Sequence, residues 1–173
     1  MKILGIDPGL NITGYGVIEV AGRRVRLVEA GVVRGGSSSN KSLAERVAEV
    51  YRGVTEVIES HAPAVMAIEE LYSHYDRPKT AILMGHARGA IILAAQLGDV
   101  NVKHYAATQI KKTLTGNGRA PKSQMQQAIA RELGLAGPPE PADVADALAI
   151  AMTHWFLEGG PMSLVSQGKK GSS

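Results

Sequence analysis

The chain has 173 residues, enough for one ordinary domain with its own core. It contains no cysteine, which excludes disulfides, zinc–thiolate sites and thiol nucleophiles. Its formal net charge of +3 is mildly basic, which is compatible with a nucleic-acid partner but does not establish one.

The N-terminus leads directly into a strand pattern and lacks the basic-then-apolar layout of a secretion signal. No apolar run approaches the ~20 residues that a membrane helix needs. We therefore expect a cytoplasmic protein with no membrane partner.

The first part of the chain predicts three strands, over residues 2–7, 12–20 and 25–33. The turns between them are short, which favours an antiparallel meander. After a loop rich in glycine and serine, apolar residues recur at helical spacing and predict a helix over residues 42–60.

The second part alternates strands and helices. Apolar runs predict strands over 64–68 and 101–105, and helices over 79–97, 108–113, 121–133 and 142–157. This order predicts an α/β fold with a mixed five-stranded sheet, three antiparallel strands followed by two parallel ones, and helices on both faces. We expect a single domain over residues 1–158 and a disordered tail over residues 159–173.

Four acids stand out. Asp7 and Glu69 each end a predicted core strand, and open α/β sheets bind ligands beyond the carboxyl ends of their strands. Either acid alone is as easily a surface residue. Asp143 and Asp146 lie three apart on one helix face, where Asp143 could simply offset the helix dipole. Asp146 is surrounded by apolar residues, and a carboxylate there is costly unless it is paired or binds a metal.

Four carboxylates without sulfur ligands suit a hard cation, Mg²⁺ or Mn²⁺. Two such ions about 4 Å apart can activate water and stabilise a leaving oxygen in phosphodiester hydrolysis. His154 lies eleven residues beyond Asp143, roughly 16 Å along the helix, so we interpret it as structural.

Basic residues gather near the predicted acidic edge and could neutralise DNA phosphates as a group, although each alone is typical of a solvated surface. They are Arg77, Lys79, Arg88, Lys111, Lys112, Arg119 and Lys122. Tyr72 and Tyr75 follow Glu69 in a polar loop, where they could stack on unpaired bases or anchor the loop. The segment GNGRAPKS falls short of a P-loop because Pro121 replaces the required glycine.

Together these segments resemble the RuvC family of Holliday-junction resolvases, from about residue 1 to residue 157. The resemblance is carried by GIDPGLNITGYG at the start, AIEELY at 67–72, GHARGA at 85–90, YAATQIKKTLTGNGRAPKSQ at 105–124 and ADVADALAIAMTH at 142–154.

This resemblance implies a ribonuclease-H-like fold and paired, Mg²⁺-dependent nicking of four-way DNA junctions by a homodimer that works with the RuvA–RuvB motor. The family's catalytic acids fall on Asp7, Glu69, Asp143 and Asp146, where we expect two ions per subunit. Tyr72 falls where the family often has phenylalanine, and Lys111 and Lys122 fall on basic positions used for DNA binding and catalysis. The helix at 79–97 is our candidate dimer interface, although it could equally pack on its own sheet.

Three other functions compete with this interpretation. A sugar-kinase or actin-like ATPase shares the Gly-Ile-Asp-x-Gly start but needs two such domains. A junction-binding protein without catalysis would leave the four acids without a role. A ribonuclease-H-like nuclease acting on RNA–DNA hybrids would keep both the fold and the acids.

Overall fold

The structure is a computed structural model that describes residues 1–36, 40–71 and 78–160. The first half of the chain forms β1 (Lys2–Asp7), β2 (Ile12–Ala21), β3 (Arg24–Arg34), α1 (Leu43–His61) and β4 (Val65–Glu69). The second half forms α2 (Pro78–Leu97), β5 (Asn101–Tyr105), α3 (Ala107–Thr115), α4 (Lys122–Glu132) and α5 (Ala142–Leu157). Every predicted element is present.

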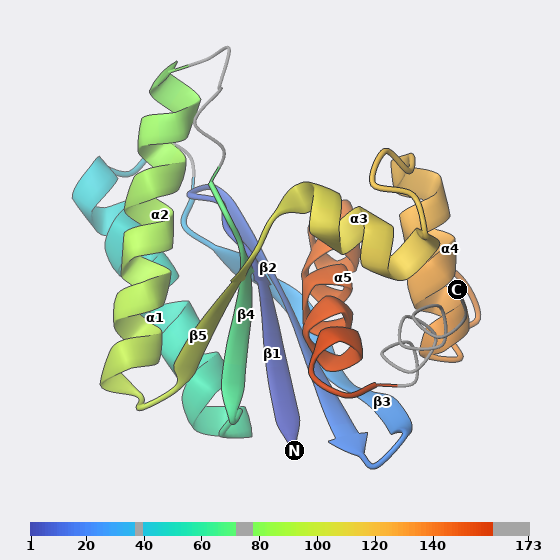
Figure 1. Cartoon of the computed structure of the whole chain (residues 1–173). Helices are drawn as coiled ribbons and strands as arrows, with labels where there is room; N and C mark the ends of the chain where they lie inside the picture. The colour runs from blue at the N-terminus through green and yellow to red at the C-terminus, as the bar shows by residue number, and fades with distance from the viewer. Residues whose placement is uncertain (37–39, 72–77, 161–173) are drawn as a thin grey trace, which may run out of the picture.

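The sheet has five strands in the order β3-β2-β1-β4-β5. β1 pairs antiparallel with β2, and β2 with β3, whereas β1, β4 and β5 run parallel. Helices α1 and α2 cover one face, and α3, α4 and α5 lie on the other (Figure 1). The predicted mixed sheet with helices on both faces is therefore confirmed.

The alternation of side chains along β1 and β4 decides where their terminal acids point. Ile3 of β1 and Val65 of β4 contribute to the core beneath α5, whereas Leu4 contributes to the core beneath α1 and α2. Successive strand residues face opposite sides of a sheet. Asp7 therefore shares the α5 side with Ile3, and Glu69 shares it with Val65.

Glycines let α5 lie directly on β1 and β2. A Cβ atom built on Gly5 would be 2.1 Å from the carbonyl oxygen of Ala147, and one on Gly14 would be 2.1 Å from that of Asp143. Real Cβ atoms never approach backbone this closely, so both positions require glycine. Gly14 also pairs with Asp7 across the β1–β2 ladder, which places the first turn of α5 above the carboxyl end of β1.

Helix α2 corrects one expectation. Within the described part of the chain it is the one helix that is long and apolar enough to cross a membrane, by length and composition only. The prediction that no segment approaches that length is therefore wrong, although core helices pass the same test. Ala87 and Ile91 are buried, whereas Ile82 and Leu97 are 62% and 65% exposed. One face of α2 therefore packs in the molecule and the other is open.

Candidate active site

The turn that follows Asp7 is fixed by side-chain hydrogen bonds. The Thr13 hydroxyl donates to the Gly9 carbonyl oxygen (2.7 Å) and accepts from the Gly9 N–H (3.3 Å). The buried guanidinium of Arg46 donates to the Gly36 carbonyl oxygen (3.0 Å) and to the side-chain oxygen of Asn11. These bonds hold the backbone at the end of β1, so Asp7 has a rigid support.

The four predicted acids form one electrostatically coupled group. β1 and β4 are neighbours in the sheet, with Ile6 opposite Ile68, so Asp7 and Glu69 emerge side by side. Burial raises the pKa of Asp7 to about 7, and the carboxylates of Asp146, Glu69 and Asp143 add to the rise. The structure therefore brings together the acids that the sequence places far apart.

Glu69 is in a similar environment, with more basic neighbours. Burial and the nearby Asp146 carboxylate raise its pKa, while Lys111, Lys122 and Arg88 oppose the rise. A buried carboxylate that must be ionised is stabilised by such cations. The site thus contains both the negative charge that attracts a metal ion and the positive charge that attracts a phosphate.

Lys122, the first residue of α4, makes the most direct contact with this group. Its ammonium lies 2.7 Å from a carboxylate oxygen of Asp146. The hydrogen bond to Asp146 raises the pKa of Lys122, and the charges of Asp146, Asp7 and Asp143 add to it. Lys122 therefore places a positive charge among the acids.

A cavity of about 220 Å³ opens beside the acids, between α3, α4 and α5. Its lining combines charged groups with apolar side chains. Its lining comprises Glu69, Lys111, Lys122 and Asp146 with Ala107, Ile110, Met125, Ala149 and Ile150. This mixture suits a phosphate bound by the charged groups and a sugar or base packed against the apolar side chains.

The other predicted DNA contacts are placed unevenly. Lys79, Lys112 and Arg119 are exposed on α2, on α3 and in the loop before α4. Tyr72 and Arg77 lie outside the described residues, as does Tyr75. The predicted structural role of His154 agrees with its position, because it is buried and its Nδ1 lies 2.6 Å from the Tyr105 hydroxyl.

The acids are chemically suited to a divalent cation without forming a ready-made ligand set. Among residues 1–36, 40–71 and 78–160, no three His, Cys, Asp or Glu side chains are already grouped closely enough to hold a metal ion. The ion pair with Lys122 turns Asp146 towards an ammonium instead. Burial is the main cause of the raised pKa of Asp7, but repulsion by the neighbouring carboxylates adds to it, and a hard cation bound among these oxygen donors would relieve that repulsion. The donor set therefore fits Mg²⁺ or Mn²⁺.

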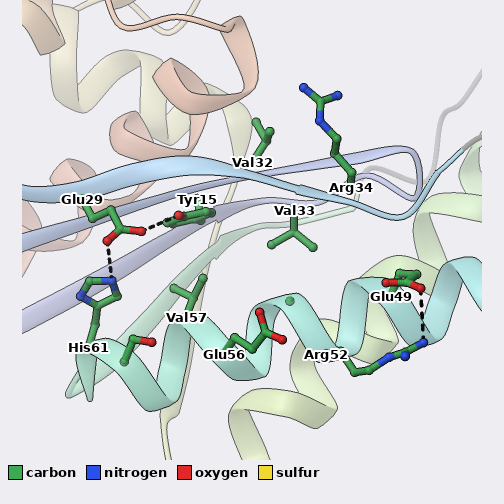
Figure 2. Close-up of a pocket in the computed structure, with 12 residues that line it drawn as sticks. Tyr15, Glu29, Val32, Val33, Arg34, Glu49, Arg52, Glu56, Val57 and His61 are labelled. Carbon is green, nitrogen blue, oxygen red and sulfur yellow. Dashed lines mark hydrogen bonds and ion pairs between the residues drawn. The ribbon is translucent and has the colours of Figure 1, made fainter.

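A larger cavity, of about 500 Å³, lies on the other face of the sheet between β2, β3 and α1 (Figure 2). There Glu29 accepts a hydrogen bond from the Tyr15 hydroxyl (2.6 Å) and pairs with His61 (3.2 Å). Burial, with the Glu29 hydrogen bond, raises the pKa of Tyr15 to about 12. None of the predicted site residues lines it within the described part of the chain, so it is separate from the acidic site.

This strand order, with two acids at the ends of β1 and β4 and two more on the helix packed above them, defines the ribonuclease-H-like class of nucleases. A family model described as crossover junction endodeoxyribonuclease RuvC matches residues 3–154. The chain therefore belongs to the RuvC family of crossover junction endodeoxyribonucleases.

Individual relatives agree with this assignment. The chain is 56% identical over 160 residues to the RuvC of Rhodopirellula baltica, covering 92% of this chain and 89% of that protein. It is 44% identical over 154 residues to the RuvC of Burkholderia vietnamiensis, covering 89% and 83% of the two chains. The Thermus thermophilus RuvC bound to a Holliday junction substrate superposes with a TM-score of 0.85 at 37% identity, covering 91% of this chain and 94% of that one.

The raised pKa of Asp7 makes a prediction for stability. Its folded-state pKa of about 7 lies above the unfolded value of 3.8, so the folded protein holds this proton more tightly. In EDTA we expect the free energy of unfolding to fall as pH rises from about 4 to 7. The loss would be about 4 kcal/mol for a fully buried group, and we expect roughly half of that because Asp7 retains some solvent contact.

Urea unfolding of the wild type and of Asp7→Asn, between pH 4 and pH 8, measures this effect. The variant should have a shallower slope, because only the contribution of Glu69 remains, and it should be the more stable protein at pH 8. Parallel slopes in the two proteins would contradict the assigned environment of Asp7.

Proposed function

We propose that this chain resolves four-way DNA junctions by paired symmetric nicks, using Mg²⁺ or Mn²⁺ held by Asp7, Glu69, Asp143 and Asp146. The observation that carries the proposal is the coupling of these carboxylates with the ammonium of Lys122 beside them. The RuvC of Thermus thermophilus, with a similar fold, is known in complex with a Holliday junction substrate.

In this proposal the acids hold two ions per subunit, which supply Lewis-acid stabilisation and activate the attacking water when bound. The chain's own residues orient the substrate. Lys122 and Lys111 would hold the scissile phosphate, because both lie close enough to the acids to affect their pKa values. The exposed Lys79, Lys112 and Arg119 would bind flanking phosphates, with Arg77, and Tyr72 would stack on an unpaired base.

We also propose that the active unit is a homodimer, because paired nicks on a two-fold junction require two sites related by a two-fold axis. An apolar cavity of about 690 Å³ between α1 and α2 supports an interface there. Its lining includes Leu43, Val47, Tyr51 and Leu93, and Leu43 and Leu93 are 41% and 51% exposed.

Replacing Leu93 with lysine should convert the dimer to a monomer, because a charge would be buried without a partner. Analytical ultracentrifugation measures the change. Leu157→Lys, at the exposed end of α5 on the other face of the sheet, is the matched control and should remain dimeric. A Leu93→Lys protein that sediments with the wild type would place the interface elsewhere.

We make three further proposals. They are a partnership with the RuvA–RuvB branch-migration complex, which rests on the family, a cytoplasmic location, and a single domain over residues 1–158. Co-purification of the chain with RuvA and RuvB on a synthetic junction would test the partnership.

Cleavage of a labelled mobile four-way junction tests the proposed function, beside a linear duplex and an RNA–DNA hybrid in the same buffer. We expect symmetric nicks on the junction that disappear in EDTA. Junction binding without cleavage in Mg²⁺ or Mn²⁺ would refute the proposed nuclease activity and indicate a junction-binding protein. Preferential cleavage of the RNA–DNA hybrid would be consistent with the fold and with catalytic acids, but it would show that the substrate is the hybrid and not the junction.

A further inference from the structure

We propose that Arg88 of α2 is a positioning residue for Glu69, and that His104 of β5 holds the Arg88 side chain in the required place. The inference rests on the proposed nuclease function and adds two residues to it. Arg88 donates one guanidinium N–H to the main-chain carbonyl oxygen of Glu69. A second guanidinium nitrogen lies 2.6 Å from Nδ1 of His104.

The topology explains how these three residues meet. Glu69 ends β4, and His104 stands opposite Ile68 on the neighbouring strand β5. Tyr105 belongs to the core beneath α5, so His104, one residue earlier, faces the opposite side, where α2 lies. Arg88 reaches down from α2 to the carboxyl ends of both strands. Its contact holds the Glu69 backbone from the face opposite to the one where the Glu69 carboxylate acts.

The chemistry of the partners determines their protonation. Arginine is always charged and only donates hydrogen bonds, so Nδ1 of His104 must accept. His104 is therefore a neutral imidazole at this contact, in agreement with burial and the Arg88 charge, which lower its pKa. The planar guanidinium can contact two acceptors at once in a fixed geometry, which an ammonium cannot reproduce.

The end of β4 is where such a support is needed. The chain leaves the sheet after Glu69, and its next backbone bond is from the Glu70 N–H to the Tyr105 carbonyl oxygen (2.9 Å). A displacement of a catalytic group by about 1 Å can cost a hundredfold in rate. Arg88 thus supports the position of Glu69 through its main chain, without touching the substrate.

A double-mutant cycle of Arg88→Met and His104→Ala tests the proposal. For each protein, kcat and KM for junction cleavage and the Kd for the junction in EDTA are measured. We expect Arg88→Met to lower kcat by about ten- to a hundredfold, with KM and Kd within about threefold of the wild type. His104→Ala should lower kcat less. The double variant should match Arg88→Met, because His104 acts through Arg88.

Two further variants make the test specific. Arg88→Lys keeps the charge without the planar fork and should recover only part of kcat. Arg52→Met removes an arginine paired with Glu49 on the exposed side of α1 and should behave as the wild type. Thermal unfolding of each protein identifies any variant that fails to fold. If Arg88→Met does not fold, the inference is tested with His104→Ala and Arg88→Lys instead.

Several results would overturn the inference. They are an unchanged kcat in Arg88→Met, a weaker junction Kd that accounts for the whole loss, and losses that multiply in the double variant. A wild type that binds the junction but cleaves nothing under Mg²⁺ or Mn²⁺ would instead refute the proposed function. The two failures are therefore distinguishable in the same experiment.

Discussion

Replacement of Asp146 with asparagine is expected to lower junction cleavage by about a thousandfold or more, with little change in junction binding. Asparagine has nearly the same shape, so α5 keeps its packing on β1 and β2. The substitution removes a negative charge from the coupled group of acids and the partner of the Lys122 ammonium. Single-turnover cleavage in Mg²⁺ and junction affinity in EDTA separate the two effects.

Asp99→Asn provides the matched control for this substitution. Asp99 lies in the turn before β5, at the end of the sheet opposite to the acids, with a φ of 54° that asparagine also tolerates. This control should cleave as the wild type does. If Asp146→Asn retained most of the cleavage activity, Asp146 would not be a catalytic residue.

Replacement of Gly14 with alanine is expected to have the second-largest effect, although Gly14 carries no functional group. Its Cβ would lie 2.1 Å from the carbonyl oxygen of Asp143 and 2.5 Å from the carbonyl carbon. The first turn of α5 must move to admit it, and Asp143 and Asp146 move with that turn. We expect a loss of about 1–3 kcal/mol in unfolding free energy and about a hundredfold in cleavage rate.

Gly85→Ala is the corresponding control, because a Cβ atom there would meet nothing within 4 Å. Gly85 lies inside α2, where alanine is favoured over glycine by up to about 1 kcal/mol. The control should therefore be as stable as the wild type or more so. Equal behaviour of Gly14→Ala and Gly85→Ala in urea unfolding would contradict the close approach of α5 to β2.

Local patterns were sufficient to predict the elements and to single out the four acids that the structure brings together. Each strand has a continuous apolar run or β-branched residues, and each helix has apolar residues at helical spacing. Asp7 and Glu69 could be identified as candidate site residues because each is an acid at the end of an apolar strand. Asp146 could be identified because it interrupts an apolar helix. The antiparallel pairing of the first three strands and the parallel pairing of the last two could be predicted from the lengths of the connections between them.

Contacts between distant segments could not be predicted from the sequence. The ion pair of Lys122 with Asp146 depends on how α4 meets α5, and the contact of Arg88 with Glu69 depends on the path of α2. Neither path is encoded by a local pattern. The glycines in β1 and β2 were a usable signal, because glycine inside a strand often marks a close backbone approach. The sequence of helix α2 is apolar on most sides. The pattern therefore could not distinguish the face that is buried from the face that is exposed.

Anomalous diffraction from crystals soaked in Mn²⁺ would test the central claim most directly. The claim is that the ends of β1 and β4 and the start of α5 form a single metal-binding centre. The account predicts manganese at about 2.0–2.4 Å from carboxylate oxygens of Asp7 and of at least one acid on α5, with Lys122 displaced from Asp146. Manganese bound elsewhere, or no manganese at these acids at millimolar concentration, would contradict it.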